Sequence, residues 1–307
     1  MTRDFIRIGV DLGGAKIEAI ALDAEGETLA RRRVATPAHD YAAIVGAIAA
    51  LVGEIESDIG RRGAVGVGAP GAISTHTGLV KNSNTAVING KPLDVDLSRS
   101  LARPVRVAND ANCFALSEAV DGAGRGAGVV FGVILGSGVG GGVVVNGRII
   151  EGRNCVAGEW GHTPLPWMTE DEYPGEPCFC GHRGCVETFL GGAGLARDYE
   201  RRSGEGRPAT QIAALAEAGD AVACESLERY QERLARGLAM VVDLIDPDVI
   251  VLGGGLSNIS RLYEGLAARV GEHAFTDALN TKILPNAHGD SSGVRGAAWL
   301  WRAGEAS

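Results

Sequence analysis

A histidine and three cysteines lie close together in the centre of this 307-residue chain. The histidine ends the run Gly158-Glu-Trp-Gly-His162, and the cysteines are Cys178, Cys180 and Cys185. Thiolates and imidazole are the ligands that Zn²⁺ prefers, and four protein ligands leave no open position for catalysis. The spacing therefore predicts a structural zinc site made of His162, Cys178, Cys180 and Cys185.

Two carboxylates, Glu159 and Glu187, flank these four residues. An irregular segment has few regular hydrogen bonds of its own, so a bound metal can supply its folding energy. We expect the metal to order the segment so that both carboxylates point at a small polar substrate.

The composition narrows the class of protein. Apolar residues make up 45% and charged residues 22%, as in soluble globular proteins. The net charge of −9 predicts no nucleic-acid partner, and no apolar run reaches the ~18–20 residues of a membrane span. A strand-like run begins at Phe5 and leaves no room for a signal peptide. Clustered cysteines suit a reducing compartment, so we expect a cytoplasmic protein.

Glycine-rich turns follow three apolar strands. The strand 5–10 leads to Gly13-Gly14-Ala15-Lys16 and a strand over 17–22, and the strand 129–135 leads to Gly136–Gly142 and a strand over 143–146. A dinucleotide fingerprint needs a helix after its glycines, so these turns are of another kind. Either turn alone fits an ordinary hairpin as well as a phosphate site. Two of them together favour phosphate binding.

The third turn, Gly253-Gly254-Gly255, follows a buried strand over 249–252. Three glycines between a strand and a helix would let a flat ring or a ribose lie close to the backbone.

Two other segments carry polar side chains that could reach a substrate. Asp110 lies between a strand over 104–108 and a helix over 113–119, where it either caps the helix or acts as a general base in a cleft between two lobes. The loop 74–92 holds Asn82 and Asn84, whose amides either bind sugar hydroxyls or serve turn geometry.

Periodicity predicts the remaining elements. Strands are expected over 27–34, 64–69 and 282–285, and helices over 41–59, 191–203, 209–218, 220–245, 261–271 and 293–302.

Taken together, the motifs resemble the ROK family of sugar kinases, within the actin/hexokinase/Hsp70-like superfamily. The resemblance covers nearly the whole chain, and the cysteine pattern is its most specific part. The markers are Asp11–Lys16, Asn109–Asn112, Gly136–Gly140, Gly158–His162, Cys178–Glu187 and Gly253–Gly255. It implies an α/β, two-lobed, ribonuclease H-like fold with a zinc-binding segment. The implied domains are a small N-terminal lobe over 1–117, onto which a C-terminal helix at about 295–307 returns, and a large lobe over 118–294 that contains 158–187.

The resemblance also implies an activity, the ATP-dependent phosphorylation of a hexose at O6. Gly158–Met168 looks most like the bacterial fructokinase (mannofructokinase) branch, which implies fructose, and also mannose, as substrate. N-acetylglucosamine kinase and glucokinase are the alternatives within the family, and a sugar-responsive regulator without catalysis is the alternative outside enzymes. No helix-turn-helix fits before Phe5, and the acidic charge disfavours DNA. A homodimer, ATP with Mg²⁺, and structural Zn²⁺ are implied.

Site residues follow from the resemblance in the same way. Asp110 is the implied general base, in a deep cleft between the lobes. Sugar contacts are implied for Gly71, Asn84, Asn109, Asp110, Glu159, His162 and Glu187. Contacts to ATP are implied for Gly13, Gly14, Ala15, Lys16, Gly136, Ser137, Gly138, Val139, Gly140, Gly253, Gly254 and Gly255.

The chain departs from the family pattern at two places. Ala15 stands where the family has threonine, which removes a hydroxyl near the phosphates. An acidic insertion, Thr169-Glu-Asp-Glu172, is expected to form a solvated loop over the cleft.

Overall fold

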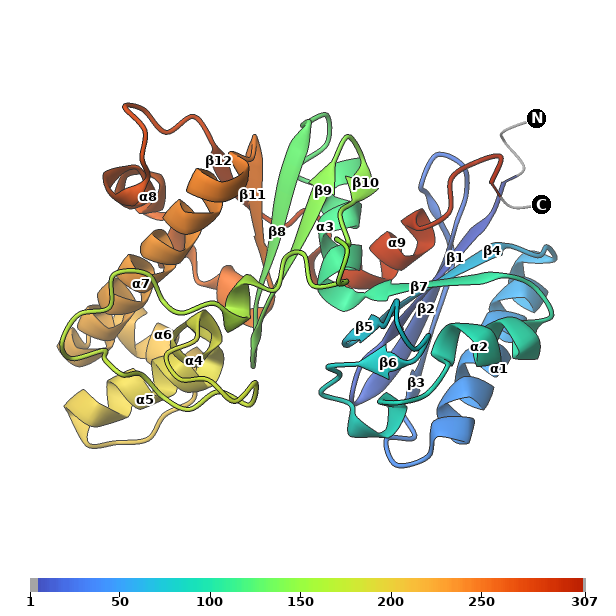
Figure 1. The fold of residues 1–307 in the computed structure, drawn as a ribbon, viewed down its shortest axis with the longest axis horizontal. Helices are drawn as coiled ribbons and strands as arrows, with labels where there is room; N and C mark the ends of the chain where they lie inside the picture. The colour runs from blue at the N-terminus through green and yellow to red at the C-terminus, as the bar shows by residue number, and fades with distance from the viewer. Residues whose placement is uncertain (1–4, 306–307) are drawn as a thin grey trace. The chain divides into compact units, whose positions relative to one another are not determined.

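The computed structural model describes residues 5–305, which form two compact units. Unit 1 comprises the chain up to Arg125, Gly142–Ala157 and the segment from Asp290 on. Unit 2 comprises Gly126–Gly141 and Gly158–Gly289. The predicted α/β fold is confirmed, and the described residues form two five-stranded sheets and one two-stranded sheet (Figure 1). The domain boundaries at 117 and 294 stay predictions.

Unit 1 is built on a five-stranded sheet with the order β3-β2-β1-β4-β7. The strands are β1 (Arg7–Leu12), β2 (Lys16–Leu22), β3 (Thr28–Ala35), β4 (Ala64–Ala69) and β7 (Val105–Asn109). The first three form an antiparallel meander, while β1, β4 and β7 run parallel. The carboxyl ends of these three parallel strands therefore meet at one edge of the sheet.

Helix α1 (Tyr41–Ile59) of unit 1 packs its apolar face on this sheet. The side chain of Asp40 caps its first turn, and Gly60 ends it in the left-handed conformation. The other helices are α2 (Leu93–Leu101), α3 (Asp110–Val120) and α9 (Ser292–Trp299). Short elements complete the unit: β5 (Ala72–Ile73), β6 (Val80–Lys81) and the 3₁₀ turn η1 (Ala86–Ile88).

Glycines let α9 pack directly against the backbone of unit 1. A Cβ at Gly9 on β1 would overlap the carbonyl oxygen of Val294, and one at Gly296 would overlap that of Cys113 on α3. Such close approach requires residues without a Cβ. The C-terminal helix is thereby fixed between the central strand and α3.

The second sheet has the order β10-β9-β8-β11-β12. Its strands are β8 (Val129–Leu135), β9 (Val139–Val145), β10 (Arg148–Ile149), β11 (Val249–Gly253) and β12 (Lys282–Pro285). Strands β8, β11 and β12 are parallel, so β8 and β11 end side by side. The far end of β9 and all of β10 are grouped with unit 1.

The helices of unit 2 are α4 (Val186–Leu190), α5 (Gly192–Ser203), α6 (Ala209–Glu217), α7 (Ala221–Ile245) and α8 (Leu266–His273). The 3₁₀ turns are η2 (Trp160–His162), η3 (Gly255–Asn258) and η4 (Ser260–Tyr263), and η5 (Gly289–Ser291) leads into α9. Helix α7 buries residues at the spacing of one helix face, such as Leu227, Tyr230, Leu234 and Leu238.

Several predicted boundaries were wrong, each for a local reason. Strand β9 begins at Val139 rather than at 143, because Gly141 and Gly142 are strand residues with neighbours where a Cβ would lie. Helix α8 begins at Leu266 rather than at 261, because Gly265 has a φ of +71°. Helix α9 ends at Trp299 rather than at 302, and the predicted loop 74–92 contains β6 and η1.

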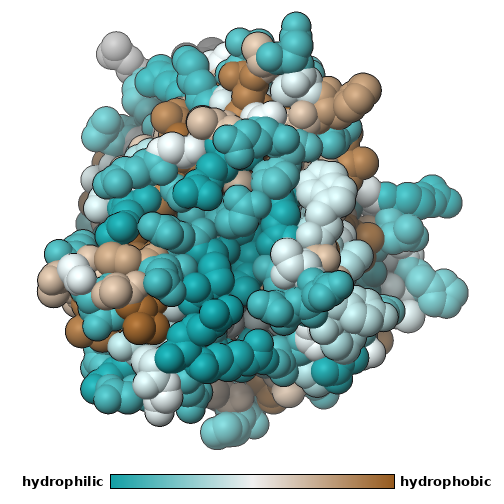
Figure 2. Space-filling model, turned by 90° about the vertical axis from the view of Figure 1, so that its left-hand side faces the viewer, coloured by the Kyte–Doolittle hydropathy of each residue, from teal (hydrophilic) through white to brown (hydrophobic). Residues whose placement is uncertain are grey.

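No helix within residues 5–305 combines the length and the apolar character that a membrane span requires. The face of the molecule in Figure 2 is mostly hydrophilic, with apolar residues in small separate patches.

Candidate functional site

Two aspartates lie at the edge of unit 1 where the parallel strands end. Asp11 on β1 is opposite Gly68 on β4, and Gly68 is opposite Ala108 on β7. Asp110 follows directly after β7 and opens α3. The carboxyl ends of strands in open α/β sheets are where ligands bind. This edge therefore carries the candidate catalytic group.

Helix α3 is capped by Asn109, not by Asp110. The side-chain oxygen of Asn109 accepts hydrogen bonds from the backbone N–H of Ala111 at 2.9 Å and of Asn112 at 3.3 Å. Capping by Asn109 starts the helix three residues earlier than the sequence predicts. Asp110 is therefore not the N-cap residue, but its Oδ1 also accepts a hydrogen bond from the N–H of Ala111 at 2.9 Å, and its carboxylate lies on the first turn of the helix.

The amide of Asn109 has a second structural role. Its Nδ2 donates a hydrogen bond to the carbonyl oxygen of Gly71 at 3.1 Å. Gly71 has a φ of +83°, and a Cβ there would overlap the carbonyl oxygen of Lys81. The loop after β4 is thus tied to the start of α3, and the second N–H of the Asn109 amide, which has no acceptor within residues 5–305, is available to a ligand.

Asp11 is a candidate site residue that sequence reasoning did not assign. Burial, then the charges of Asp110 and Glu18, raise its carboxyl pKa from 3.8 to about 6. A buried carboxyl group beside another one is a place where a cation is favourable. The available signal was an aspartate at the end of a buried strand, directly before the first glycine turn.

The first glycine turn is held by hydrogen bonds of its own backbone. The N–H of Gly13 donates to the carbonyl of Lys16 at 3.0 Å, and the hydroxyl of Thr36 donates to the carbonyl of Gly13 at 2.7 Å. Within residues 5–305, the N–H groups of Gly14 and Ala15 have no acceptor. Gly13 is therefore a structural member of the turn, while Gly14 and Ala15 have N–H groups available for an anion.

A buried carboxylate lies beneath this turn. Glu18 on β2 is 2% exposed and forms ion pairs with Lys16 at 3.7 Å, with Arg33 at 2.7 Å and with Arg31. The ion pair keeps the ammonium group of Lys16 close to the turn that precedes it.

The second and third glycine turns lie side by side in unit 2. Gly136 follows β8, and Gly254 follows the neighbouring strand β11. Gly254 has a φ of +81°, and a Cβ there would lie 2.5 Å from the carbonyl oxygen of Leu135. Only glycine fits at that position. The N–H groups of Ser137 and Gly138 have no backbone acceptor among the described residues.

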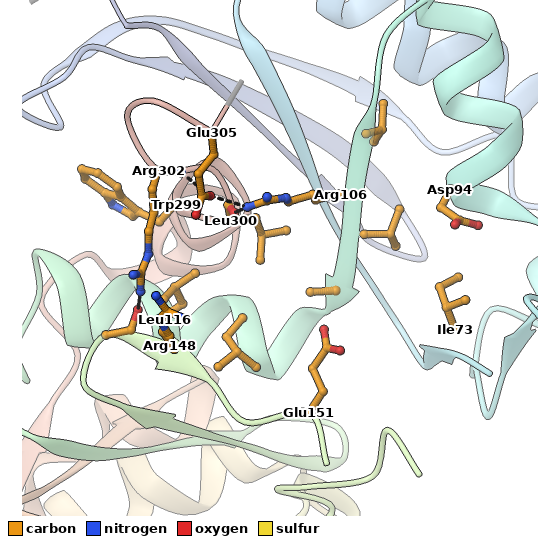
Figure 3. A pocket seen from close by; sticks show the side chains of 15 residues that line it. Ile73, Asp94, Arg106, Leu116, Arg148, Glu151, Trp299, Leu300, Arg302 and Glu305 are labelled. Atoms are coloured by element: carbon orange, nitrogen blue, oxygen red, sulfur yellow. Dashed lines mark hydrogen bonds and ion pairs between the residues drawn. The ribbon is translucent and has the colours of Figure 1, made fainter. Parts of the chain in front are cut away.

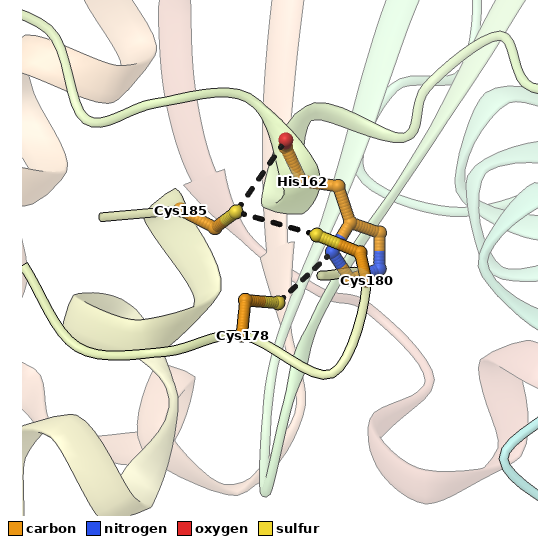
Figure 4. A group of neighbouring side chains, drawn as sticks. All are labelled: His162, Cys178, Cys180 and Cys185. Atoms are coloured by element: carbon orange, nitrogen blue, oxygen red, sulfur yellow. Dashed lines mark hydrogen bonds between the residues drawn. The ribbon is translucent and has the colours of Figure 1, made fainter. Parts of the chain in front are cut away.

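The four predicted zinc ligands come together in unit 2 (Figure 4). Their donor atoms all lie within 4.8 Å of one another. Nδ1 of His162 is 3.5 Å from Sγ of Cys178, and the Sγ atoms of Cys180 and Cys185 are 3.6 Å apart. Tetrahedral zinc with bonds of about 2.0–2.3 Å places neighbouring donors roughly 3.5–3.8 Å apart. The donor set therefore fits zinc in both chemistry and spacing.

The cysteine segment packs on the second glycine turn. Glu187, on the first turn of α4, accepts a hydrogen bond from the N–H of Val139 at 3.0 Å through Oε2. Its other oxygen lies 3.9 Å from Sγ of Cys178. Trp160 donates from Nε1 to the carbonyl of Gly140 at 3.0 Å. Glu187 thus joins the metal ligands to the turn, while Glu159 is half-buried just before Trp160.

Asn84 is exposed on the loop after β6. That loop is held by Asn89, which sequence reasoning missed. The amide of Asn89 accepts from the N–H of Ser83 at 3.0 Å and donates to its carbonyl at 2.8 Å. Asn82 has a φ of 59° and serves turn geometry.

The acidic insertion is exposed at Thr169, Glu170 and Asp171, as the sequence predicts, but it is buried at Glu172. Glu172 is 8% exposed and forms ion pairs with Arg233 at 2.7 Å and Arg236 at 2.8 Å, both on α7. Burial opposes ionisation, but these two arginines hold the pKa of Glu172 at about 2. The insertion is therefore fastened to α7, because a buried carboxylate needs cationic partners.

Comparison with known proteins places this geometry in a family. The model of the ROK family matches residues 7–304. The chain belongs to the ROK family. A relative from Vibrio cholerae, named N-acetyl-D-glucosamine kinase, is 45% identical over 296 residues, which are 95% of this chain and 98% of that protein.

Two solved ROK structures share the fold. The ROK hexokinase from Thermus thermophilus has a TM-score of 0.85 and 30% identity, over 96% of this chain and 97% of that one. A ROK glucokinase from Streptomyces griseus, solved with glucose and AMPPNP, has a TM-score of 0.76 and 30% identity, over 96% and 98% of the two chains.

The expected closeness to the fructokinase branch is not supported. The relative at 45% identity is named for N-acetyl-D-glucosamine, which the sequence reasoning placed second. The run Gly158–Met168 lies in the metal segment and its insertion, which pack on α7 and on the second glycine turn. Sequence similarity within this run therefore depends on packing as well as on sugar choice.

Proposed function

We propose that this ROK protein is an ATP-dependent sugar kinase that transfers the γ-phosphoryl group of ATP to O6 of N-acetyl-D-glucosamine. The observation that carries the proposal is the 45% identity to a kinase of that name over nearly the full length of both chains. The candidate base and the glycine turns are the chemical groups that such a reaction requires.

Asp110 is the proposed general base. It accepts the proton of the 6-hydroxyl group while O6 forms its bond to the γ-phosphorus and ADP leaves. Phosphoryl transfer depends mostly on positioning and on charge neutralisation, and general-base assistance adds about 10²–10⁴-fold. Asn109 positions the base, because it caps the helix on whose first turn Asp110 lies.

The backbone N–H groups of the turns are the proposed phosphate donors. Gly14 and Ala15 offer them in unit 1, and Ser137 and Gly138 offer them in unit 2. Lys16 adds a positive charge beside the first turn. Because these donors are backbone groups, the loss of a threonine hydroxyl at Ala15 leaves them in place.

The nucleotide implies Mg²⁺, which bound to the phosphates would neutralise the charge that develops during transfer. Mg²⁺ in such sites is bound through one or two carboxylates besides the phosphates. Asp11 fits this role, since burial and then the charge of Asp110 disfavour its ionised form and raise its pKa, and it lies two residues before Gly13 of the first glycine turn.

Glu159, His162 and Glu187 are the proposed sugar contacts of unit 2. Nδ1 of His162 faces the cysteines, which leaves Nε2 for a sugar hydroxyl. Zinc held by His162 and the three cysteines would fix the position of these side chains and take no part in phosphoryl transfer. The expected homodimer stays a prediction.

The proposal is tested by a coupled assay of ADP release with ATP and a panel of sugars. We expect the highest kcat/KM with N-acetyl-D-glucosamine and lower values with glucose, mannose and fructose. A preference for fructose would restore the first expectation from the sequence. Absence of turnover with every sugar would point to a sugar-responsive regulator.

A further inference from the structure

A cavity of about 490 Å³ lies within unit 1, away from the residues assigned above (Figure 3). It is lined by β7, by the hairpin that contains β10 and by the segment that follows α9. None of the residues assigned to sugar, nucleotide or zinc lines it. Volumes of about 300–1,000 Å³ are those of small-molecule sites.

One end of this cavity is basic. Arg302 donates to the carbonyl of Gly147 at 2.7 Å, and its charge also acts on the carboxylate of Glu305. The side chain of Arg148 has no hydrogen-bond or ion-pair partner within residues 5–305, while its backbone pairs with β9. Arg106, in contrast, is neutralised by Glu305 at 2.7 Å and lies over the ring of Trp301. Three guanidinium groups therefore share one carboxylate, Glu305, and this end keeps a net positive charge.

The other side of the cavity is acidic. Oδ1 of Asp94 is buried and has no hydrogen-bond partner among the described residues. A buried carboxylate oxygen without a hydrogen-bond donor costs free energy. A ligand that brings such a donor to Asp94 would remove this cost. Glu151, also without an ion pair in residues 5–305, adds a second negative charge. In Figure 3 both carboxylates lie apart from the cluster formed by Arg106, Arg148 and Arg302.

Apolar side chains also line the cavity, among them Ile73, Leu116 and Ile149. In Figure 3, Ile73 lies beside Asp94 and Leu116 lies beside Arg148. A ligand that carries opposite charges on an aliphatic linker would satisfy the charges on both sides and cover these side chains.

We propose that this cavity binds a small zwitterion, with its ammonium group at Asp94 and Glu151 and its phosphate or carboxylate group at Arg148 and Arg302. The site is independent of the proposed kinase reaction. Its ligand would contact β7, the strand that ends at Asn109 and precedes the candidate base.

Isothermal titration calorimetry with ω-aminoalkyl phosphonates of increasing chain length tests the proposal on the full chain. One chain length is expected to bind best, and the alkyl phosphonate and alkylamine of that length are expected to bind weakly. Asp94→Asn and Arg148→Gln should each weaken binding of the best probe about tenfold, since hydrogen bonds to charged groups contribute about 1.5–3 kcal/mol. Melting curves verify that both variants fold.

Arg99→Gln and Asp171→Asn are the matched controls, because both side chains are largely exposed and outside the cavity. Both variants are expected to bind the probe like the unmodified protein. Saturating the unmodified protein with N-acetyl-D-glucosamine is also expected to leave its affinity for the probe unchanged. The proposal is overturned if no aminoalkyl phosphonate binds. It is also overturned if the singly charged analogues bind equally well, or if Asp94→Asn and Arg148→Gln bind the probe unchanged. The assay needs no turnover, so its outcome does not depend on the kinase proposal.

Discussion

Glu187 accepts a hydrogen bond from the backbone N–H of Val139 at 3.0 Å, and through this bond the metal segment holds the second glycine turn. The same carboxylate lies 3.9 Å from Sγ of Cys178. A Cβ at Gly138 would overlap it, so the turn and the carboxylate fit each other closely. One side chain thus connects a proposed zinc ligand with a proposed phosphate-binding turn.

Replacing Glu187 by alanine should weaken the binding of both substrates, ATP and the sugar. The N–H of Val139 loses a charged acceptor, and such hydrogen bonds contribute about 1.5–3 kcal/mol. We expect higher KM values for both ATP and the sugar in steady-state kinetics. Glu170→Ala, at an exposed position of the insertion, is the control and should leave both KM values unchanged. An effect on sugar alone would show that the turn does not depend on Glu187.

Removing a zinc ligand should act on sugar binding rather than on the chemical step. Cys180→Ser is expected to lower the zinc content measured by mass spectrometry and to raise the KM for sugar, because Glu159 and Glu187 lose their support. The exposed His182 lies beside Cys180, and His182→Ala is the matched control that should retain zinc. If zinc is lost while sugar affinity stays the same, the segment does not position the sugar contacts.

Glu172 should be a large contributor to stability. Its removal leaves Arg233 and Arg236 on α7 without their shared carboxylate, and breaking a buried ion pair from one side costs about 3–5 kcal/mol. Glu172→Gln is expected to lower the free energy of unfolding by about 3 kcal/mol at pH 7. Asp171→Asn, whose side chain is 87% exposed, should change it by less than about 0.5 kcal/mol.

The effect of Glu172 should depend on pH in one direction. The folded pKa of about 2 lies below the ordinary 4.5, so the folded state binds fewer protons in this window. Its stabilisation is fully present above about pH 4.5 and is lost as the pH falls toward 2. Urea unfolding at pH 7 and pH 3 should therefore show a smaller difference between Glu172→Gln and the unmodified protein at pH 3. An equal difference at both values would contradict the ion-pair account.

More of the fold than of the candidate site could be predicted from the sequence. Alternating and helical apolar patterns gave the strands and most helices, because burial imposes those periods on the chain. The capping by Asn109 and the burial of Glu172 depend on tertiary neighbours, Gly71 and helix α7, that no local pattern specifies. The clustering of His162 with the three cysteines could be predicted, because metal chemistry restricts both residue type and spacing.

The ionised carboxylate of Asp11 should destabilise the folded protein at neutral pH, although the proposed reaction needs it to bind Mg²⁺. Its folded pKa of about 6 exceeds the ordinary 3.8, so the folded state binds more protons in that window. Stability due to this group therefore falls as the pH rises from about 4 to about 6, by roughly 2–3 kcal/mol.

Asp11→Asn should accordingly raise the melting temperature at pH 8, with no gain below pH 4, and should reduce turnover because an amide binds Mg²⁺ poorly. Asp58→Asn on α1 is the control, since its surface ion pair with Arg32 contributes little. A variant that melts lower at pH 8, or that turns over at the normal rate, would contradict this role.

The most direct test of the account is the turnover of Asp110→Asn with ATP and N-acetyl-D-glucosamine. The amide keeps the size of the side chain but cannot accept the proton of the 6-hydroxyl group. We expect kcat to fall about 10²–10⁴-fold, while the melting temperature and the sugar affinity measured by calorimetry stay close to those of the unmodified protein. A kcat near the unmodified value would contradict the assignment of Asp110 as the general base.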